Sequence, residues 1–470
     1  MSAERSPLEA RLGLFDATAL VAGSMIGSGI FIVSADIARR LPAPGWLLLV
    51  WTLAGVLTVA GAWSYGALAA AMPRAGGQYV YLTELWGPLW GFLYGWTLVL
   101  VIQTGTIAAV AVAFATFAGH LWPAIGREAF LRVGPVGVSP VQVVAIAVIL
   151  LLTALNARGL ELGRVVQNVF TVAKLGTLAA VIVVCVALGG GARTGNLSVS
   201  PFTTGLTPSD LVLALGASMV GALFSADAWA NVTFTAGETR DPRRTIPRAL
   251  VLGTTIVCAL YLVTNVAYLN VLPLVGSPDA GDIVGRGIQY AAGDRVGTAA
   301  IAVVAGGPVG ATLMALAVMV STFGCANGLV LAGARVAWAM ARDGRFFRRA
   351  ARVNAAHVPG PALWMQGLWA SLLALSGRYG DLLDYVIIAE LIFYLLTVGG
   401  LFVLVRRQGE PLRGAWYPWL QIAYLAIVGA LVGVLLVAKP AYTWGSLAVV
   451  ASGVPFYVCW RPRRLTQRAA

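Results

Sequence analysis

Charged side chains are scarce in this chain. They make up 11% of its 470 residues, whereas soluble domains have about 25%. Hydrophobic residues make up 59%, and several apolar runs are longer than the roughly 20 residues that cross a bilayer. This composition excludes an ordinary soluble protein and predicts an all-α, polytopic membrane protein. No short apolar stretch with a cleavage site precedes the first apolar run, so we expect no cleaved signal peptide.

Histidine and cysteine are also rare. The two histidines, His120 and His357, lie far apart in predicted loops, so no histidine-based metal site is expected. The four cysteines fall within or at the ends of apolar runs, which is typical of small buried side chains rather than of a disulfide framework. The chain has no Walker-type phosphate loop, and the acidic residues in its apolar runs are isolated. We therefore expect no metal, no cofactor, no ATP drive and no enzymatic activity.

The charge that is present is mostly positive, with a formal net charge of +13. In a soluble protein this excess would suggest a nucleic-acid partner. Here the arginine-rich tracts at 240–248 and 342–352 fall on the same predicted side of the membrane as both termini. The positive-inside rule places that side in the cytoplasm. The sequence thus predicts a protein of the cytoplasmic (inner) membrane with both termini cytoplasmic, surrounded by the lipid bilayer and without a nucleic-acid partner.

The apolar pattern predicts twelve membrane-spanning helices in a single domain, residues 1–470, because no polar linker interrupts the chain. The Gly-interrupted segment 283–305 is predicted as an external interfacial helix, and residues 74–87 as a short amphipathic cytoplasmic segment. Counting 283–305 as a span would put the two arginine-rich tracts on opposite sides. The predicted spans are 12–40, 45–72, 88–118, 137–155, 164–189, 210–237, 250–272, 308–341, 361–377, 380–405, 417–438 and 442–460.

The first and sixth spans look interrupted. The first contains Gly27, Ser28 and Gly29 in its middle, and each glycine costs about 1 kcal/mol of helix propensity. The sixth contains small residues, a carboxylate and an amide at mid-depth, over residues 221–231. The sixth span comes five positions after the first, an odd number, so the broken helices run in opposite directions. This arrangement points to an inverted repeat with a binding site at the interface between its halves.

The predicted substrate follows from the chemistry of an opened helix. Such a helix exposes N–H groups that suit an anion and C=O groups that suit a cation. Because a zwitterion has one charge of each sign, the breaks predict a carrier of amino acids. The N–H candidates for the carboxylate belong to Ser28, Gly29 and Ile30. The carbonyl candidates for the ammonium belong to Met25, Ile26, Phe224 and Asp227.

An alternative is that the glycines only let helices pack closely, since Gly23 and Gly27 have the spacing of a small-xxx-small face. If the breaks are functional, the residues that flank them form the site. The candidate substrate-binding residues are Met25, Ile26, Gly27, Ser28, Gly29, Ile30, Phe224, Ser225 and Asp227.

Lys174 stands inside the apolar run of the fifth span and is one of only two lysines in the chain. An ionisable side chain at this depth is expensive and is a functional hypothesis by default. Its ammonium could take the place of a bound sodium ion and would repel a second cation, or it could exchange protons. The alternative is a lysine whose side chain snorkels to the membrane interface.

Two acidic residues also lie in predicted spans. Asp227, in the sixth-span break, could contact a basic substrate side chain, neutralise Lys174, carry a proton or cap the second half-helix. Glu390, among apolar neighbours in the tenth span, is either a proton site or a structural partner. The gating and coupling candidates are therefore Phe224, Lys174, Asp227 and Glu390.

Two further sets of residues have both a functional and a structural interpretation. Phe224 and Trp229 flank the sixth-span break, where an aromatic side chain could close over a substrate or simply pack between helices. Span eight carries a polar stripe that could face the site or make interhelical hydrogen bonds. The stripe consists of Ser321, Thr322, Cys325 and Asn327.

Residues 23–31 resemble the first-helix signature of the amino acid–polyamine–organocation permeases. Five further segments resemble the same family and follow in the family's order. They correspond to the loop after helix two, the helix-five region, the loop after helix six and the end of helix eight. The segments are Pro73–Tyr81, Asn156–Gly159, Gln167–Lys174, Gly237–Pro247 and Ala339–Gly344.

The resemblance implies the leucine-transporter fold, a five-plus-five inverted repeat with discontinuous helices 1 and 6. Repeat one would cover about 12–189 and repeat two about 210–405, with two extra helices at about 417–460. The nearest branch resembles bacterial relatives of the L-type amino acid transporters. In that branch a helix-five lysine, matched by Lys174, stands where sodium-coupled relatives bind sodium. Phe224 matches the aromatic gate of helix six.

The chain also departs from the family's pattern. The position of Asp227 is commonly glycine in the family, and a carboxylate there argues against a plain neutral specificity. The predicted external loop 119–136 contains no cysteine, so no disulfide-linked heavy chain is expected as a partner.

The sequence therefore favours a secondary active transporter of amino acids that is sodium-independent and works by exchange. A proton-coupled symporter of cationic amino acids or polyamines is the alternative, favoured by Asp227 and Glu390. A membrane amino-acid sensor is the alternative from a different class, and the short tail at 461–470 argues against it.

Overall fold

The first and sixth apolar runs are both broken at the predicted positions. The computed structural model describes residues 8–126, 128–133, 136–189, 195–196, 200–376, 379–409 and 417–460. Helices α1 (Leu14–Met25) and α2 (Gly29–Arg40) form one span that is bent by 40°. Helix α10 (Pro208–Ser225) ends before a 3₁₀ helix, η2 (Trp229–Glu238). Between them Ala228 has a left-handed backbone with φ of 67°, which an α-helix cannot accommodate.

Most of the remaining described chain is helical. Proline stands at the start of α3, α5, α7, α10, α11, α14 and α18, where its missing N–H removes no helical hydrogen bond and its φ suits the first turn. The long helices are α3 (Pro44–Ala71), α5 (Pro88–Thr97) continuing through a π-helical turn into α6 (Gln103–Leu121), α7 (Pro140–Ala157), α8 (Leu160–Leu188), α11 (Pro242–Val271), α14 (Pro308–Arg342), α15 (Gly360–Ser376), α16 (Tyr379–Gln408), α17 (Trp419–Ala438) and α18 (Pro440–Cys459).

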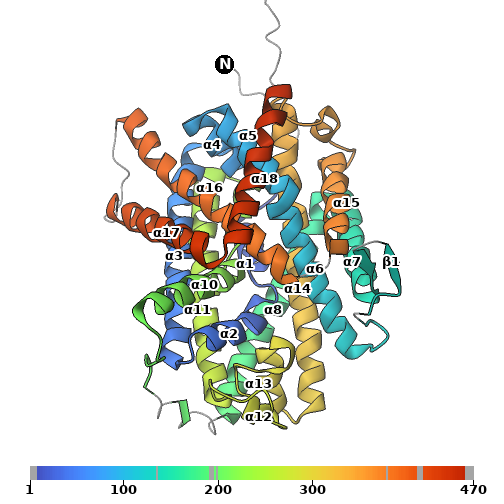
Figure 1. The fold of residues 1–470 in the computed structure, drawn as a ribbon. Coiled ribbons are helices and arrows are strands. Elements are labelled where there is room, and N and C mark those ends of the chain that lie inside the picture. Colours follow the sequence, from blue (N-terminus) through green and yellow to red (C-terminus); the bar gives the residue numbers. More distant parts are fainter. Residues whose placement is uncertain are drawn as a thin grey trace, which may run out of the picture.

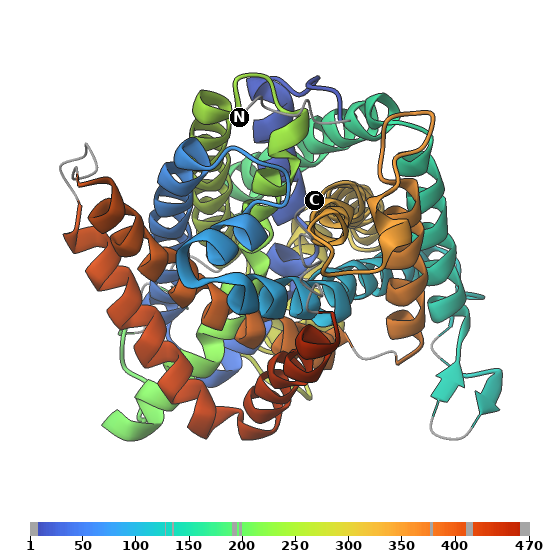
Figure 2. The same ribbon diagram turned by 90° about the horizontal axis from the view of Figure 1, so that it is seen from above.

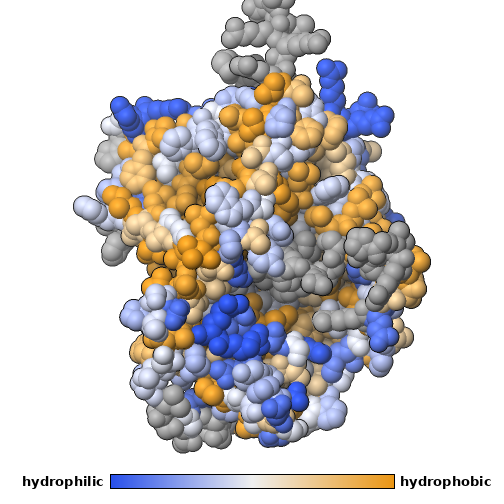
Figure 3. Space-filling view, in the orientation of Figure 1, coloured by the Kyte–Doolittle hydropathy of each residue, from blue (hydrophilic) through white to orange (hydrophobic). Residues whose placement is uncertain are grey.

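These helices coincide with the predicted spans. In the described parts of the chain, nine helices are long and apolar enough to cross a membrane, or ten if the bent pair α1 and α2 counts as one span. The apolar side chains that cover much of the surface in Figure 3 are what a bilayer would contact. Twelve spans and a five-plus-five repeat stay predictions.

Two segments differ from the all-helical prediction. Strands β1 (Leu131–Val133) and β2 (Val136–Val138) pair antiparallel, and this hairpin projects from one edge of the bundle (Figure 2). The segment 283–305 is not one helix but contains two α-helices, α12 (Ile283–Arg286) and α13 (Val296–Val304), with a short 3₁₀ helix, η3 (Ala292–Asp294), between them. Gly287 and Gly293, with φ of 61° and 62°, adopt the left-handed conformation between them and interrupt the helix.

The segments that the charge pattern placed on one side meet at one end of the bundle. Helix α4 (Gln78–Trp86) lies at the upper end in Figure 1, whereas α12 and α13 lie at the lower end. At the upper end the Tyr79 hydroxyl donates to Asp343 at 2.7 Å. Burial, and then the carboxylate of Asp343, raise the pKa of this phenol above its ordinary value. The tails predicted to be cytoplasmic, 1–7 and 461–470, lie outside the described residues.

Candidate functional site

A small polar pocket lies between the two breaks. Its volume is about 20 Å³, which is enough for about one water molecule. Seven of the predicted site residues line it, whereas Ile26 and Ile30 do not. The lining consists of Ser24, Met25, Gly27, Ser28, Gly29, Thr106, Val110, Phe224, Ser225, Asp227, Ala228 and Cys325. The helices therefore pack closely around this pocket, and a molecule larger than water can enter it only if the helices move.

The carbonyl groups at the end of α1 accept hydrogen bonds from side chains of α8 and α14. Lys174, which is 1% exposed, donates to the carbonyl oxygens of Gly23 at 2.7 Å and Ile26 at 2.8 Å. Ser321 donates to the carbonyl oxygens of Ile26 and Gly27 at 3.1 and 3.0 Å. Because its ammonium is buried against the helix terminus, Lys174 does not snorkel to an interface.

Part of the polar stripe of α14 faces the first-span break, and part of it makes hydrogen bonds elsewhere. Ser321 contacts the break, and the Cys325 thiol donates to the carbonyl oxygen of Ser24 at 2.9 Å. Asn327 instead donates to Gly163 and Gln167 of α8, which is an interhelical contact away from the break. Thr322 donates only within its own helix.

Tyr261 on α11 joins the two breaks, and sequence reasoning missed it. Its hydroxyl lies 3.1 Å from the carbonyl oxygen of Met25 and 3.1 Å from that of Ser225. One hydroxyl has a single proton, so it can fully satisfy only one of these two carbonyl groups at a time. The Tyr261 ring packs edge-to-face on Trp51 of α3, with centroids 5.4 Å apart. A polar tyrosine in the apolar run of the seventh span was the signal available in the sequence.

The glycines of the first break have different surroundings. A Cβ atom on Gly29 would lie 2.1 Å from Ser225 Oγ and 3.0 Å from Ser225 Cα, and one on Gly23 would meet Gln167 and Thr171 of α8 at 2.1 and 2.2 Å. Close helix packing thus explains Gly23 and Gly29. At Gly27 the nearest atom would be Cys325 Sγ at 3.4 Å, so packing does not explain this glycine. Helix α2 starts at Gly29, and its first N–H groups have no acceptor within the helix.

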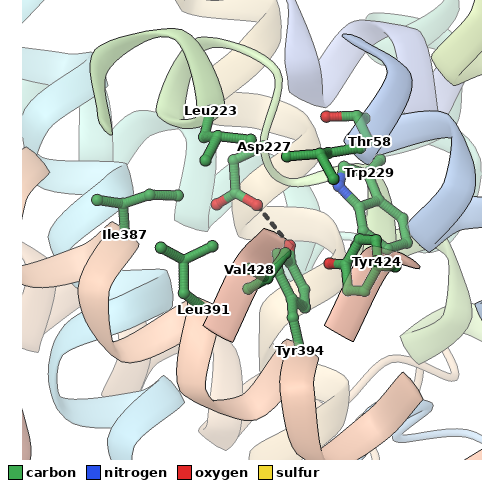
Figure 4. A pocket seen from close by; sticks show the side chains of 10 residues that line it. Thr58, Leu223, Asp227, Trp229, Ile387, Leu391, Tyr394, Tyr424 and Val428 are labelled. Atoms are coloured by element: carbon green, nitrogen blue, oxygen red, sulfur yellow. Dashed lines mark hydrogen bonds between the residues drawn. The ribbon is translucent and has the colours of Figure 1, made fainter. Parts of the chain in front are cut away.

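Asp227 faces α16 rather than Lys174. Its carboxylate accepts a 2.5 Å hydrogen bond from the Tyr394 hydroxyl, which Figure 4 shows as a dashed line. The Trp229 ring stacks on Tyr394 at 5.2 Å between centroids, which is helix packing rather than a cover over the pocket. Glu390, one turn before Tyr394 on α16, does not line the pocket between the breaks. Phe224 lines that pocket and is 9% exposed.

A buried ion pair closes the end of the bundle that carries α4. Arg335 of α14 donates to both carboxylate oxygens of Glu238, at 2.8 and 2.9 Å, and the two side chains are 1% and 0% exposed. The Glu238 carbonyl oxygen also accepts from the backbone N–H groups of Arg11 and Leu12. This pair ties η2, α14 and the N-terminal segment together. The sequence prediction did not single out either residue.

The chemistry of the site is that of binding. Among the described residues, no three histidine, cysteine, aspartate or glutamate side chains gather in a way that could hold a metal ion. The pocket is lined by the start of α2, whose first N–H groups have no acceptor within the helix, by the ends of α1 and α10 with their carbonyl groups, by one aromatic side chain and by one carboxylate.

A bundle of apolar helices with a polar pocket between two broken helices has the architecture of a secondary membrane transporter. The chain belongs to the amino acid permease family, within the amino acid–polyamine–organocation superfamily, and the family's sequence pattern matches residues 12–456. The resemblance seen in the sequence is thereby confirmed.

Several transporters are similar to this chain along most of its length. The Serine/threonine exchanger SteT of Bacillus subtilis (strain 168) is 29% identical over 472 residues, which cover 99% of this chain and 100% of the relative. The b(0,+)-type amino acid transporter 1 of Homo sapiens is 28% identical over 461 residues, covering 96% and 88%. The Asc-type amino acid transporter 1 of Mus musculus is 28% identical over 471 residues, covering 98% and 84%.

Proposed function

We propose that this protein is a sodium-independent exchanger of amino acids that works by alternating access around the pocket between the two breaks. The observation that carries the proposal is the contact of the Lys174 ammonium with the carbonyl oxygens of Gly23 and Ile26. These groups form the negative end of the α1 dipole, where a cation is favoured. Lys174 supplies that cation as a fixed part of the protein.

A sodium ion has no place beside this ammonium. Two unit charges about 4 Å apart repel by about 4 kcal/mol at the effective dielectric near a protein surface, and the carbonyl oxygens of Gly23 and Ile26 are already occupied. Sodium coupling through this end of α1 is therefore unfavourable. The relative named an exchanger, at 29% identity over the whole chain, supports exchange as the mode of transport.

The two poles of a zwitterion fit opposite ends of the broken helices. The substrate carboxylate would bind the N–H groups of Gly29 and Ile30, which start α2 without a side-chain cap, at the positive end of the α2 dipole. The ammonium would bind the carbonyl groups of Met25 and Ser225, which share one Tyr261 proton and so have unused acceptor capacity. This differs from the sequence prediction, which included Ile26, because Lys174 and Ser321 occupy that carbonyl group.

Alternating access requires the pocket to open to one side at a time. Because the cavity of about 20 Å³ holds only about one water molecule, the closed bundle described above is one state of the cycle. Phe224 would move with the α10 break as the pocket opens. Repeat one (about 12–189) and repeat two (about 210–405) would rearrange against each other in the cytoplasmic membrane, with both termini in the cytoplasm and no disulfide-linked heavy chain.

Proton-coupled symport of cationic amino acids or polyamines is a second candidate function, favoured by one observation. The Asp227 carboxylate lines the pocket and is 8% exposed, and no ion pair with a basic residue of the described chain neutralises it. A substrate with a basic side chain could neutralise this carboxylate on binding.

Transport into proteoliposomes tests the proposal. Radiolabelled amino acids are supplied with and without internal amino acid, a sodium gradient and a pH gradient. We expect uptake that requires internal amino acid and does not depend on sodium. The labelled amino acids that are taken up will show whether the substrates are neutral or cationic. Uptake into empty vesicles driven by sodium would refute it, and uptake into empty vesicles driven by an inward proton gradient would favour the second candidate.

Lys174 has a matched control in the other lysine of the chain. Lys174→Met keeps most of the side-chain volume but removes two charged hydrogen bonds, each worth about 1.5–3 kcal/mol. Desolvation of the ammonium offsets part of this, so we expect an apparent affinity loss of about 10- to 100-fold. Lys439→Met, at the junction of α17 and α18, should leave exchange unchanged. Unchanged exchange by Lys174→Met would remove Lys174 from the mechanism.

A further inference from the structure

A cluster of titratable side chains links the sixth-span break to α16. Asp227 and Glu390 are 8% and 4% exposed. The Tyr394 hydroxyl donates to Asp227 Oδ1 at 2.5 Å, and Glu390 lies one helical turn before Tyr394 on α16. The broken span and an unbroken helix thus each bring one buried acid to the same cluster, and the two acids act on each other electrostatically.

Among the described residues, no lysine, arginine or histidine acts on either carboxyl group. Asp227 and Tyr394 act on Glu390, and Glu390 in turn acts on the hydroxyl groups of four tyrosines. Lys174 contacts backbone carbonyl groups instead. The four tyrosines are Tyr65 on α3, Tyr94 on α5, Tyr394 on α16 and Tyr424 on α17.

The hydrogen bonds of the cluster are also incomplete. Glu390 Oε2 is buried without a hydrogen-bond partner, and so is the hydroxyl of the neighbouring Tyr94. An ionised carboxylate in such a place would cost several kcal/mol, and two adjacent carboxyl groups cannot both ionise readily. The geometry requires that at least one positive charge accompany the pair when the bundle is closed.

The cavity beside the cluster limits what that charge can be. It has a volume of about 10 Å³, and its polar lining residues are Asp227, Tyr394, Tyr424, Trp229 and Thr58, with apolar side chains around them (Figure 4). This space holds at most about one water molecule. A hydrated metal ion or a substrate side chain does not fit here in the closed bundle, whereas a proton does.

We propose that Asp227 and Glu390 form a proton-binding site that holds one proton while the bundle is closed and releases it when the sixth-span break opens to water. The proton comes from water on the open side and forms an O–H bond with a carboxylate oxygen. On opening, that bond breaks and the proton returns to water. The Tyr394 hydroxyl, one turn after Glu390 on α16, positions the Asp227 carboxyl group.

Closing the bundle would then be linked to the uptake of one proton. The linkage relation makes the closing equilibrium about tenfold less favourable for each unit of pH, once the open state has lost the proton. This inference rests on the proposed exchange, since each cycle passes through the closed state. Exchange should therefore slow as the pH rises.

The experiment measures exchange with the same pH on both sides of the vesicle membrane, so that no proton gradient drives it. The wild type should show an alkaline limb that approaches a tenfold fall per pH unit. Glu390→Gln should flatten this limb, Glu390→Asp should restore it, and the exposed carboxylate variant Glu84→Gln should keep the wild-type profile. A Glu390→Gln profile with the wild-type slope would overturn the proposal.

A second measurement covers the case in which Glu390→Gln does not assemble. Substrate is added to the purified wild-type protein in weakly buffered detergent. Each protein molecule should then take up about one proton from solution, and a pH-sensitive dye measures the resulting change in pH. No uptake of protons would overturn the proposal. If the wild type exchanges at every pH with a flat profile, only the proton site fails, whereas an absence of exchange at every pH is a failure of the proposed function.

Discussion

Gly29 is the position where the smallest change should have the largest effect. Its ideal Cβ would lie 2.1 Å from Ser225 Oγ, 2.7 Å from Ser225 Cβ and 3.0 Å from Ser225 Cα. The hydroxyl can rotate away, but the Cβ and Cα atoms move only with the backbone of α10. Since carbon atoms pack at about 3.5–4.0 Å, Gly29→Ala must push α2 and α10 apart by roughly 1 Å.

The magnitude follows from the cost of overpacking. Inserting a methyl group into a packed site costs about 1–3 kcal/mol, and here the cost falls on the closed state, in which the two breaks meet. We expect the closed state to be about 5- to 150-fold less populated, and exchange in proteoliposomes to slow accordingly at equal amounts of reconstituted protein. Gly433→Ala on α17 is the matched control, because a Cβ atom there would meet no atom within 4 Å and the residue lies outside the pocket between the breaks.

Two outcomes would refute this reasoning. One is wild-type exchange by Gly29→Ala, and the other is an equal loss of exchange in Gly433→Ala. A second-site variant adds a direct test, since Ser225→Gly removes the Oγ and Cβ atoms that the new methyl group meets. The double variant should recover part of the lost exchange, because only the 3.0 Å contact with the Ser225 Cα atom remains.

Two other variants test the contacts that hold the closed bundle together. Tyr261→Phe leaves the carbonyl groups of Met25 and Ser225 without their shared donor, which costs about 1–3 kcal/mol of stability in the empty protein. A bound substrate ammonium should restore that stability, so saturating substrate should raise the melting temperature of the variant more than that of the wild type. An equal rise in both proteins would contradict this role. Arg335→Met leaves the fully buried Glu238 carboxylate unpaired, which costs about 3–5 kcal/mol of stability. The melting temperature should therefore fall steeply, and the added substitution Glu238→Gln should restore part of the lost stability. An unchanged melting temperature in Arg335→Met would show that the pair is not structural.

Much of the site was predictable because its signals are local in the sequence. The glycine cluster at residues 27–29 and the small and polar residues at 221–231 weaken an α-helix wherever they occur, and the structure has breaks at both places. A lysine in an apolar run is conspicuous in the same way, and Lys174 lies at the end of α1. The predicted interfacial helix at 283–305 was wrong in detail, because two left-handed glycines divide it.

The residues that the prediction missed make their contacts over long distances in the chain. Tyr261 lies 236 residues from Met25, and Arg335 lies 97 residues from Glu238. Their polarity in an apolar run is a signal, but nothing in the local sequence shows which distant group each of them contacts. The same holds for Asp227, whose partner proved to be Tyr394, 167 residues away, rather than Lys174.

The sequence by itself determined the class of protein, the family and the positions of the two breaks, because apolar run length, helix-breaking residues and motif order are properties of neighbouring residues. Only the tertiary structure decided which carbonyl groups remain available to a substrate and which acids lie together. Those facts depend on how each helix is rotated and packed against the others, and a helix presents a different side chain to its neighbour with every 100° of rotation. Helical periodicity restricts that choice, but packing between distant segments makes it.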